Sequence, residues 1–260
     1  MKYLSRCLAL LLVAAMAVLA GCTGAGIPEG AFEAYTAALE KNAALKSVHV
    51  KTDIDAKVLV AGVETEIPMT MEMKMGKDGS ISMNMSMSVL GMAMDVPMYY
   101  IDDVLYMEML GMKIKMSVTD DAAKEEMNLE AVNPQLAIPE EALVNASMEK
   151  KDGNTVYTAE FDGQLIAQEL MDTISSSLDS LEDVVTDNLT FGTVKYAYTI
   201  DKNGYLCRQE LDFSISFTAD GAQASAEYRM VFEALDLGKD ITPDKPADPD
   251  EYMDLSEITG

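Results

Sequence analysis

Apolar and polar residues alternate along most of this chain, and the period of the alternation changes with position. Across residues 31–45, a segment rich in alanine and glutamate, apolar side chains recur at roughly helical spacing: Phe32, Tyr35, Leu39 and Leu45. That spacing predicts one amphipathic helix. From there to residue 118 the period falls to two, which is the period of a β-strand. The pattern therefore predicts a helix followed by a long run of strands.

Methionine supplies much of the apolar half of the two-residue pattern. Methionines at positions 69, 71, 73 and 75 alternate with polar residues, and this run is followed by a hairpin signal, Lys77-Asp78-Gly79. The alternation resumes at Ile81 and continues in three further runs over 92–101, 104–109 and 112–118. We therefore expect an antiparallel meander of about six strands with one apolar, methionine-rich face.

The rest of the chain repeats the order of helix and then strands. Residues 119–137 favour a helix or an irregular segment with an acidic start, which suits a helix N-terminus. Alternation over 142–150 and 155–161 predicts a second hairpin, joined by a Lys-Asp-Gly-Asn turn. Helical spacing returns over 163–185, and 189–237 contains three more alternating strands connected by tight turns.

Together these elements predict an α+β domain over residues 31–237. About eleven strands would form one highly curved antiparallel sheet, an open half-barrel, with two or three helices packed in its concave side. Residues 238–260 contain three prolines, with seven acidic side chains against two basic ones. Such a composition has little apolar surface to bury, so we expect an acidic, disordered tail there.

The N-terminus has the plan of a secretory signal. Lys2 and Arg6 precede an apolar run over 7–20, which is too short to span a membrane as a stable anchor. The run leads into Leu-Ala-Gly-Cys, ending at Cys22. These four residues resemble the bacterial lipobox, which implies cleavage after residue 21 and a diacylglyceryl group on Cys22. Residues 22–30 would then be a short lipidated tether.

A cysteine that carries two or three acyl chains holds a protein firmly on a membrane. We therefore expect residues 1–21 to be discarded as a signal peptide. The mature lipoprotein would lie on the extracytoplasmic face of the cell membrane, anchored through Cys22.

The chain is strongly acidic, with 44 acidic and 19 basic residues and a formal net charge of −25. Such a charge repels nucleic acid and argues against a phosphate-binding surface. Of three cysteines, Cys7 leaves with the signal peptide and Cys22 carries lipid, so Cys207 has no partner within the chain. A lone thiol of this kind is more often a small buried apolar residue than a nucleophile.

The sequence shows no motif for catalysis or cofactor binding. Its single histidine, His49, lies in a presumed strand, and there is no Gly-x-Ser-x-Gly elbow for a hydrolytic triad. Nucleotide-binding glycine loops and zinc-spaced Cys/His clusters are also missing from the sequence. We therefore expect neither an enzyme nor a cofactor.

The order of elements on a secreted lipoprotein resembles the lipoprotein-carrier superfamily. The resemblance rests on Phe32-Glu33-Ala34-Tyr35 running into Leu45-Lys46-Ser47-Val48, and on the hairpin from Tyr198-Thr199-Ile200-Asp201 to Tyr205-Leu206. This superfamily includes the carrier and receptor of the Lol pathway and the mycobacterial glycolipid-carrying lipoproteins. The chain looks closest to uncharacterised lipoproteins of Gram-positive bacteria. The resemblance implies an unclosed barrel whose apolar cavity accommodates acyl chains.

The 21 methionines allow three interpretations. They can be ordinary core under the first helix, or they can line a cavity, because unbranched thioethers repack around varied apolar partners. They can also bind Cu(I), which soft thioethers favour. Residues two apart on one strand lie about 7 Å apart, too far to share one ion without help from another strand.

We expect a membrane-anchored lipoprotein that binds or carries an apolar ligand, a lipid or acyl chain, in a methionine-lined concave cavity. The residues expected to line the cavity are Met71, Met73, Met83, Met85, Met87, Met107 and Met109. The alternative is a structural or sensory lipoprotein that binds another envelope protein and holds no ligand. Cu(I) binding through methionines is a further alternative.

Overall fold

The structure is a computed structural model, and seven stretches of the chain are described. They are residues 28–60, 62–89, 92–109, 111–118, 142–166, 190–219 and 222–255. The expected signal peptide, Cys22 and the helix or irregular segment expected at 119–137 lie outside the described residues, as does most of the helix expected at 163–185. None of the helices in the described stretches is long and apolar enough to cross a membrane.

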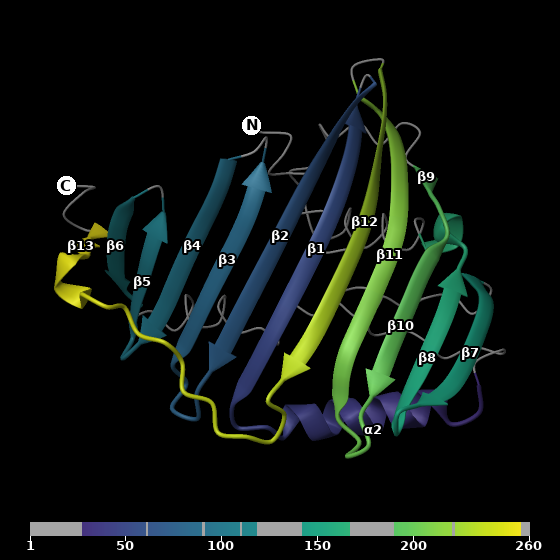
Figure 1. The fold of residues 1–260 in the computed structure, drawn as a ribbon, viewed down its shortest axis with the longest axis horizontal. Coiled ribbons are helices and arrows are strands. Elements are labelled where there is room, and N and C mark those ends of the chain that lie inside the picture. Colours follow the sequence, from purple (N-terminus) through teal and green to yellow (C-terminus); the bar gives the residue numbers. More distant parts are fainter. Residues whose placement is uncertain are drawn as a thin grey trace.

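The described strands form one large, open, curved sheet (Figure 1). The N-terminal meander contains β1 Val48–Val60, β2 Val63–Met75, β3 Ile81–Val89, β4 Met92–Ile101, β5 Val104–Met109 and β6 Met112–Ser117. The later strands are β7 Leu143–Lys151, β8 Asn154–Phe161, β9 Thr190–Phe191, β10 Val194–Ile200, β11 Leu206–Ala219, β12 Ala222–Leu235 and β13 Met253–Asp254. The antiparallel sheet expected from the sequence is confirmed, with 13 described strands in place of about eleven.

Two meanders meet in the middle of this sheet. The strand order is β13-β6-β5-β4-β3-β2-β1-β12-β11-β10-β8-β7, with β9 paired to β11. The junction is the antiparallel pairing of β1 with β12, which extends from His49 opposite Leu235 to Val60 opposite Ala224. Strands nearly 190 residues apart in sequence are therefore neighbours, and the two halves share one continuous pair of faces.

Tight turns fix the register of the hairpins. Asp152 and Gly153, between β7 and β8, both have positive φ, at 54° and 84°. Asp102 and Asp103, between β4 and β5, also have positive φ, at 51° and 62°. Two consecutive residues with positive φ suit the right-handed twist of a two-residue hairpin, and aspartate and glycine tolerate this conformation best. The turn predicted around Asp152 is therefore confirmed.

Helix α2, Ala31–Ala43, lies across one end of the later strands (Figure 1). Ala31 and Ala38 are buried in a cluster with Tyr157, Ile200 and Leu206 from β8, β10 and β11. The helix expected over 31–45 is thus confirmed to within two residues. Packing of helices in the concave side stays a prediction, because the other helical segments lie largely outside the described residues.

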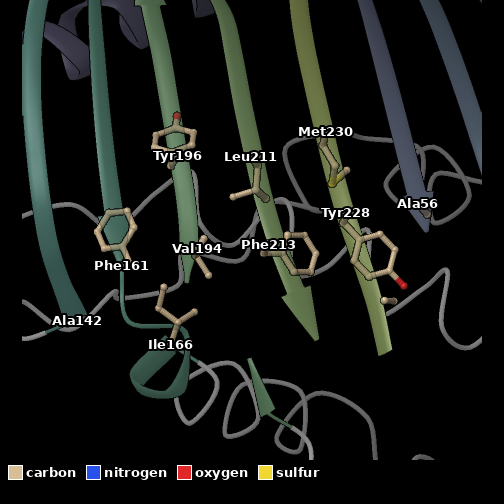
Figure 2. Close-up of a cluster of buried hydrophobic side chains, with 11 residues drawn as sticks. Ala56, Ala142, Phe161, Ile166, Val194, Tyr196, Leu211, Phe213, Tyr228 and Met230 are labelled. Carbon is tan, nitrogen blue, oxygen red and sulfur yellow. The ribbon is translucent and has the colours of Figure 1, made fainter. Parts of the chain in front are cut away.

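The two faces of the sheet differ sharply in polarity. One face of the β8 to β12 half carries the main core, in which Phe161, Leu211 and Met230 are almost completely buried. Figure 2 shows these side chains along strands β8, β11 and β12, with Ile166 near Phe161 and Val194. The opposite face of the same strands carries ion pairs, including that of Arg208 with Glu210 at 2.8 Å. Strict two-residue alternation produces this separation.

The segment 238–255, here called the strap, corrects the prediction of a disordered tail. It runs beneath the ends of β1 to β4 and adds β13 in parallel to β6 (Figure 1). Tyr252 is only 3% exposed and packs edge-on against Tyr106, with 5.2 Å between ring centroids. Acidic strap residues pair with lysines of the sheet, as Asp244 does with Lys74 at 2.8 Å. A buried aromatic ring and complementary charges therefore order a segment whose composition suggested solvation.

Candidate functional site

The seven methionines expected to line a cavity all lie on one face of the sheet. Met71 and Met73 are on β2, Met83, Met85 and Met87 on β3, and Met107 and Met109 on β5. Met71 is directly opposite Met85, and Met73 is opposite Met83. Because residues paired across a ladder point to the same side, the two strands present one shared surface.

The register extends this surface over further methionines that the cavity prediction did not include, among them two on β4. Met98 of β4 lies between Met83 of β3 and Met107 of β5. Met94 of β4 lies opposite Met87. The alternation over 92–101 already placed both on an apolar strand face. Their alignment with the other methionines depends on strand pairing, which the local pattern does not specify.

One line of methionines crosses four consecutive strands. Met73, Met83, Met98 and Met107 are paired in succession from β2 to β5, and we call them the methionine row. The line continues to Val50 on β1 at one end and to Ile114 on β6 at the other. The row therefore lies within an unbroken apolar stripe across the sheet.

The methionine half of the apolar face is less buried than the core half. All four members of the methionine row are partly exposed, as are Met71, Met85 and Met87. Met109 is 36% exposed. In contrast, Leu211 and Met230, on the same face in the β8 to β12 half, are each 1% exposed. One continuous apolar face thus has a closed half and a partly open half.

The opposite face carries dense charge near the centre of the sheet. The Arg208 guanidinium donates to Glu210 at 2.8 Å, and this hydrogen bond holds the pKa of that carboxyl below its ordinary value. Burial raises the pKa of Asp212, two residues along the same strand, although Arg229 lies 3.7 Å away. Such a surface suits polar or solvent contacts, so an apolar ligand would be directed to the methionine face.

A hollow of about 590 Å³ lies on the charged face. The residues that line it include Asp55, Glu66 and Arg229 of the charged face. They also include Ala56, Ile67, Phe213 and Tyr228, which are aligned across four strands and whose side chains belong to the core face. None of the seven predicted cavity methionines lines it. The hollow is therefore separate from the methionine surface.

The single histidine and the free cysteine have structural contacts. His49 Nε2 lies 2.9 Å from Glu72 Oε1, and its Nδ1 lies 3.0 Å from Asp236 Oδ2. Burial raises the pKa of the Cys207 thiol, which donates to the Thr199 carbonyl at 3.4 Å. A raised pKa disfavours the reactive thiolate. In the described stretches, no group of three or more His, Cys, Asp and Glu side chains is arranged to hold a metal.

The family comparison matches the sheet from α2 to the end of β12. A family model described as a family of unknown function, DUF6612, covers residues 31–236. The chain belongs to the DUF6612 family. The matched range ends just before the strap. A search of curated proteins gave no match to this DUF6612 sequence.

Solved structures that resemble this DUF6612 chain are distant in sequence. LprF from Mycobacterium bovis is 13% identical, with 84% of this chain and 98% of that chain covered and a TM-score of 0.32. A DUF1329 family protein from Desulfovibrio piger is 11% identical, with 82% and 95% covered and a TM-score of 0.28. A LolA superfamily protein from Nitrosomonas europaea is 10% identical, with 83% and 95% covered and a TM-score of 0.21. The superfamily named from the sequence resemblance is thus represented among the matches.

Proposed function

We propose that this protein is a lipid-anchored extracytoplasmic binding protein that holds an apolar ligand, a lipid or acyl chain, against the methionine half of its sheet. The observation that carries the proposal is the partly open, continuous apolar surface of β2 to β5. Methionines from these four strands meet there in register. Unbranched thioether side chains adapt to ligands of different shape, which suits flexible acyl chains.

The size of the surface is adequate for such a ligand. Neighbouring strands are about 4.8 Å apart, so the line from β2 to β6 measures roughly 19 Å. Burial of about ten methylene groups at about 0.8 kcal/mol each contributes roughly 8 kcal/mol before the costs of association. A gain of that size corresponds to about micromolar affinity before those costs are subtracted, and to weaker affinity after them. We therefore expect reversible binding of the kind a carrier or lipid sensor uses.

The membrane anchor in this proposal rests on Cys22 and the residues before it. A diacylated cysteine would place the sheet close to the membrane, because only residues 23–30 separate it from α2. Cys22→Ala should move the protein from the membrane fraction to the soluble extracytoplasmic fraction. Mass spectrometry of the mature N-terminus should show a diacylglyceryl group on the wild-type protein. A membrane-bound, unmodified wild-type protein would contradict this part of the proposal.

Native mass spectrometry tests the ligand directly. Residues 23–260 would be purified from a bacterial envelope fraction without detergent, and the mass compared before and after solvent extraction. We expect a discrete added mass that extraction removes and that added fatty acid or phospholipid restores. A bare polypeptide mass that gains no lipid would reject the proposal. The search would then turn to envelope proteins as partners, with the methionines serving as core.

A matched pair of substitutions on β3 places the ligand on one face. Met85 is on the methionine face, and the exposed Asn84 beside it is on the opposite face. Met85→Glu introduces a carboxylate into the apolar surface and should raise the lipid Kd by about tenfold or more, equal to about 1.4 kcal/mol. Asn84→Glu adds the same charge and should leave the Kd unchanged. Equal effects of the two variants in a fluorescent fatty-acid assay would rule out binding at this face.

A further inference from the structure

The methionine row brings four thioethers closer together than the sequence spacing allows. Residues two apart on one strand are separated by about 6.6 Å or more, whereas adjacent strands are about 4.8 Å apart. Met73, Met83, Met98 and Met107 each come from a different strand and are paired in succession. The distance that argued against a shared ion within a single strand therefore does not apply to neighbouring members of the row, although the two ends of the row lie roughly 14 Å apart.

The side chains in the row can adjust further to a small ion. Methionine has three rotatable bonds and no branch at Cβ, so neighbouring sulfurs can converge by a change of rotamer. All four residues are partly exposed, which leaves freedom to make that change. A buried row, such as the one containing Leu211 and Met230, would lack it.

The donors available select one chemical class of ion. Thioether sulfur is a soft, neutral ligand that favours Cu(I), while calcium and magnesium require oxygen ligands. The positions that continue the row are Val50 and Ile114, which supply no oxygen or nitrogen from their side chains. The formal net charge of −25 attracts cations in general to the molecule. The net charge therefore attracts cations without selecting among them, and the thioethers of the row determine which cation binds there.

We propose that the methionine row binds Cu(I), with each ion held by the thioethers of two or three neighbouring members among Met73, Met83, Met98 and Met107. This activity is separate from lipid binding, because it depends on sulfur and not on the apolar character of the face. Leucine distinguishes the two, since it keeps the size and hydrophobicity of methionine and removes the sulfur.

The test compares two fourfold variants of the mature lipoprotein in non-ionic detergent. The row variant carries Met→Leu at positions 73, 83, 98 and 107. The control variant carries Met→Leu at four exposed positions outside the line of the row, which are Met92, Met112, Met116 and Met148. A third variant, Cys207→Ser, removes the free thiol. Each protein is titrated anaerobically with Cu(I) against a chromogenic chelator.

We expect the wild-type, control and Cys207→Ser proteins to withdraw Cu(I) from the chelator, and the row variant to bind it at least about tenfold more weakly. X-ray absorption of the wild-type complex should show a sulfur-only first shell, and this measurement does not depend on the row variant folding. Failure of the wild type to compete, oxygen or nitrogen in the first shell, or full binding by the row variant would overturn the proposal.

Discussion

Two carboxylates on β11 show how local surroundings set the behaviour of a residue on the charged face. Glu210 lies 2.8 Å from Arg208 and 3.3 Å from Arg229, and its pKa is lowered chiefly by the hydrogen bond from Arg208. Asp212 is on the same face, and burial raises its pKa despite its contact with Arg229. The two residues are two positions apart, yet their ionised forms should affect stability in opposite directions.

Glu210→Gln should destabilise the protein at pH 7 by about 1 kcal/mol. A carboxyl with a lowered folded pKa binds fewer protons when folded, so its contribution is complete above its ordinary pKa of about 4.3. This stabilising contribution is lost as the pH falls through the lowered pKa that Glu210 has in the folded state. Urea denaturation from pH 7 to pH 3 should therefore show the wild type and the variant converging in acid. A constant difference at every pH would contradict this assignment.

Asp212→Asn should have the reverse effect. Burial makes the charge unfavourable in the folded state, so stability falls as the pH rises through the ordinary aspartate pKa of about 3.9 and on to the raised folded value. The variant should be more stable than the wild type at pH 7 by about 0.5 kcal/mol, and the gain should vanish in acid. The same urea series measures it, with Glu210→Gln as the comparison. A loss of stability at pH 7 would show that Arg229 outweighs burial.

At the level of elements, the strap protects an edge of the sheet. Without β13, strand β6 would present unpaired backbone groups, which favour association with other chains. The Tyr252 hydroxyl donates to Glu108 on β5, and Lys113 of β6 pairs with Glu251 at 2.6 Å. The strap is therefore attached to the last strands by its own side chains as well as by the short ladder with β6.

Removal of residues 240–260 should lower the free energy of unfolding and promote self-association through β6. Analytical ultracentrifugation and hydrogen exchange of β6 amides measure the two effects. Removal of residues 256–260 alone keeps the strap and serves as the control. A 240–260 deletion that stays monomeric and fully stable would show that the strap has no protective role.

Tyr252→Phe keeps the ring but removes the hydroxyl that donates to Glu108. This variant should lower the free energy of unfolding by about 1 kcal/mol without causing self-association.

At the level of the whole molecule, one apolar face has a closed half, which forms the core, and a partly open half, where we propose that the ligand binds. The core of Figure 2 lies over β8 to β12, where Phe161 and Leu211 are each 1% exposed. The methionine surface lies over β2 to β5 and is partly open. A surface that admits a ligand cannot also be fully packed, so a closed core beside a partly open surface is compatible with the proposed binding.

Leu211→Ala and Met85→Ala test this separation. Leu211→Ala should cost about 2–5 kcal/mol, because it leaves a cavity in a closed core. Met85→Ala should cost less than half as much in stability, because Met85 is already partly exposed, but it should weaken lipid binding. Chemical denaturation and the fatty-acid assay give both values for each variant. Equal losses of stability would indicate that the methionine half is core.

The amino-acid sequence by itself determined the strands, the hairpin at Asp152-Gly153, helix α2 and the apolar methionine face. These features depend on two-residue alternation, helical spacing and turn residues, which act over a few neighbouring positions. The sequence also supplied the signal for anchoring at Cys22, which stays a prediction. The composition of residues 238–260 was misleading, because Tyr252 and two of the prolines are buried and acidic side chains of the strap pair with lysines of the sheet.

Only the tertiary structure decided the pairing of β1 with β12, the position of the core and the alignment of the methionine row. The free energy of these pairings comes from surfaces that meet across long sequence separations, so no local window contains it. Met73 and Met107 are 34 positions apart, but the register of three hairpins places both in one line. The methionine pattern is a local property of the strands, and the site that it forms is a property of the assembled sheet.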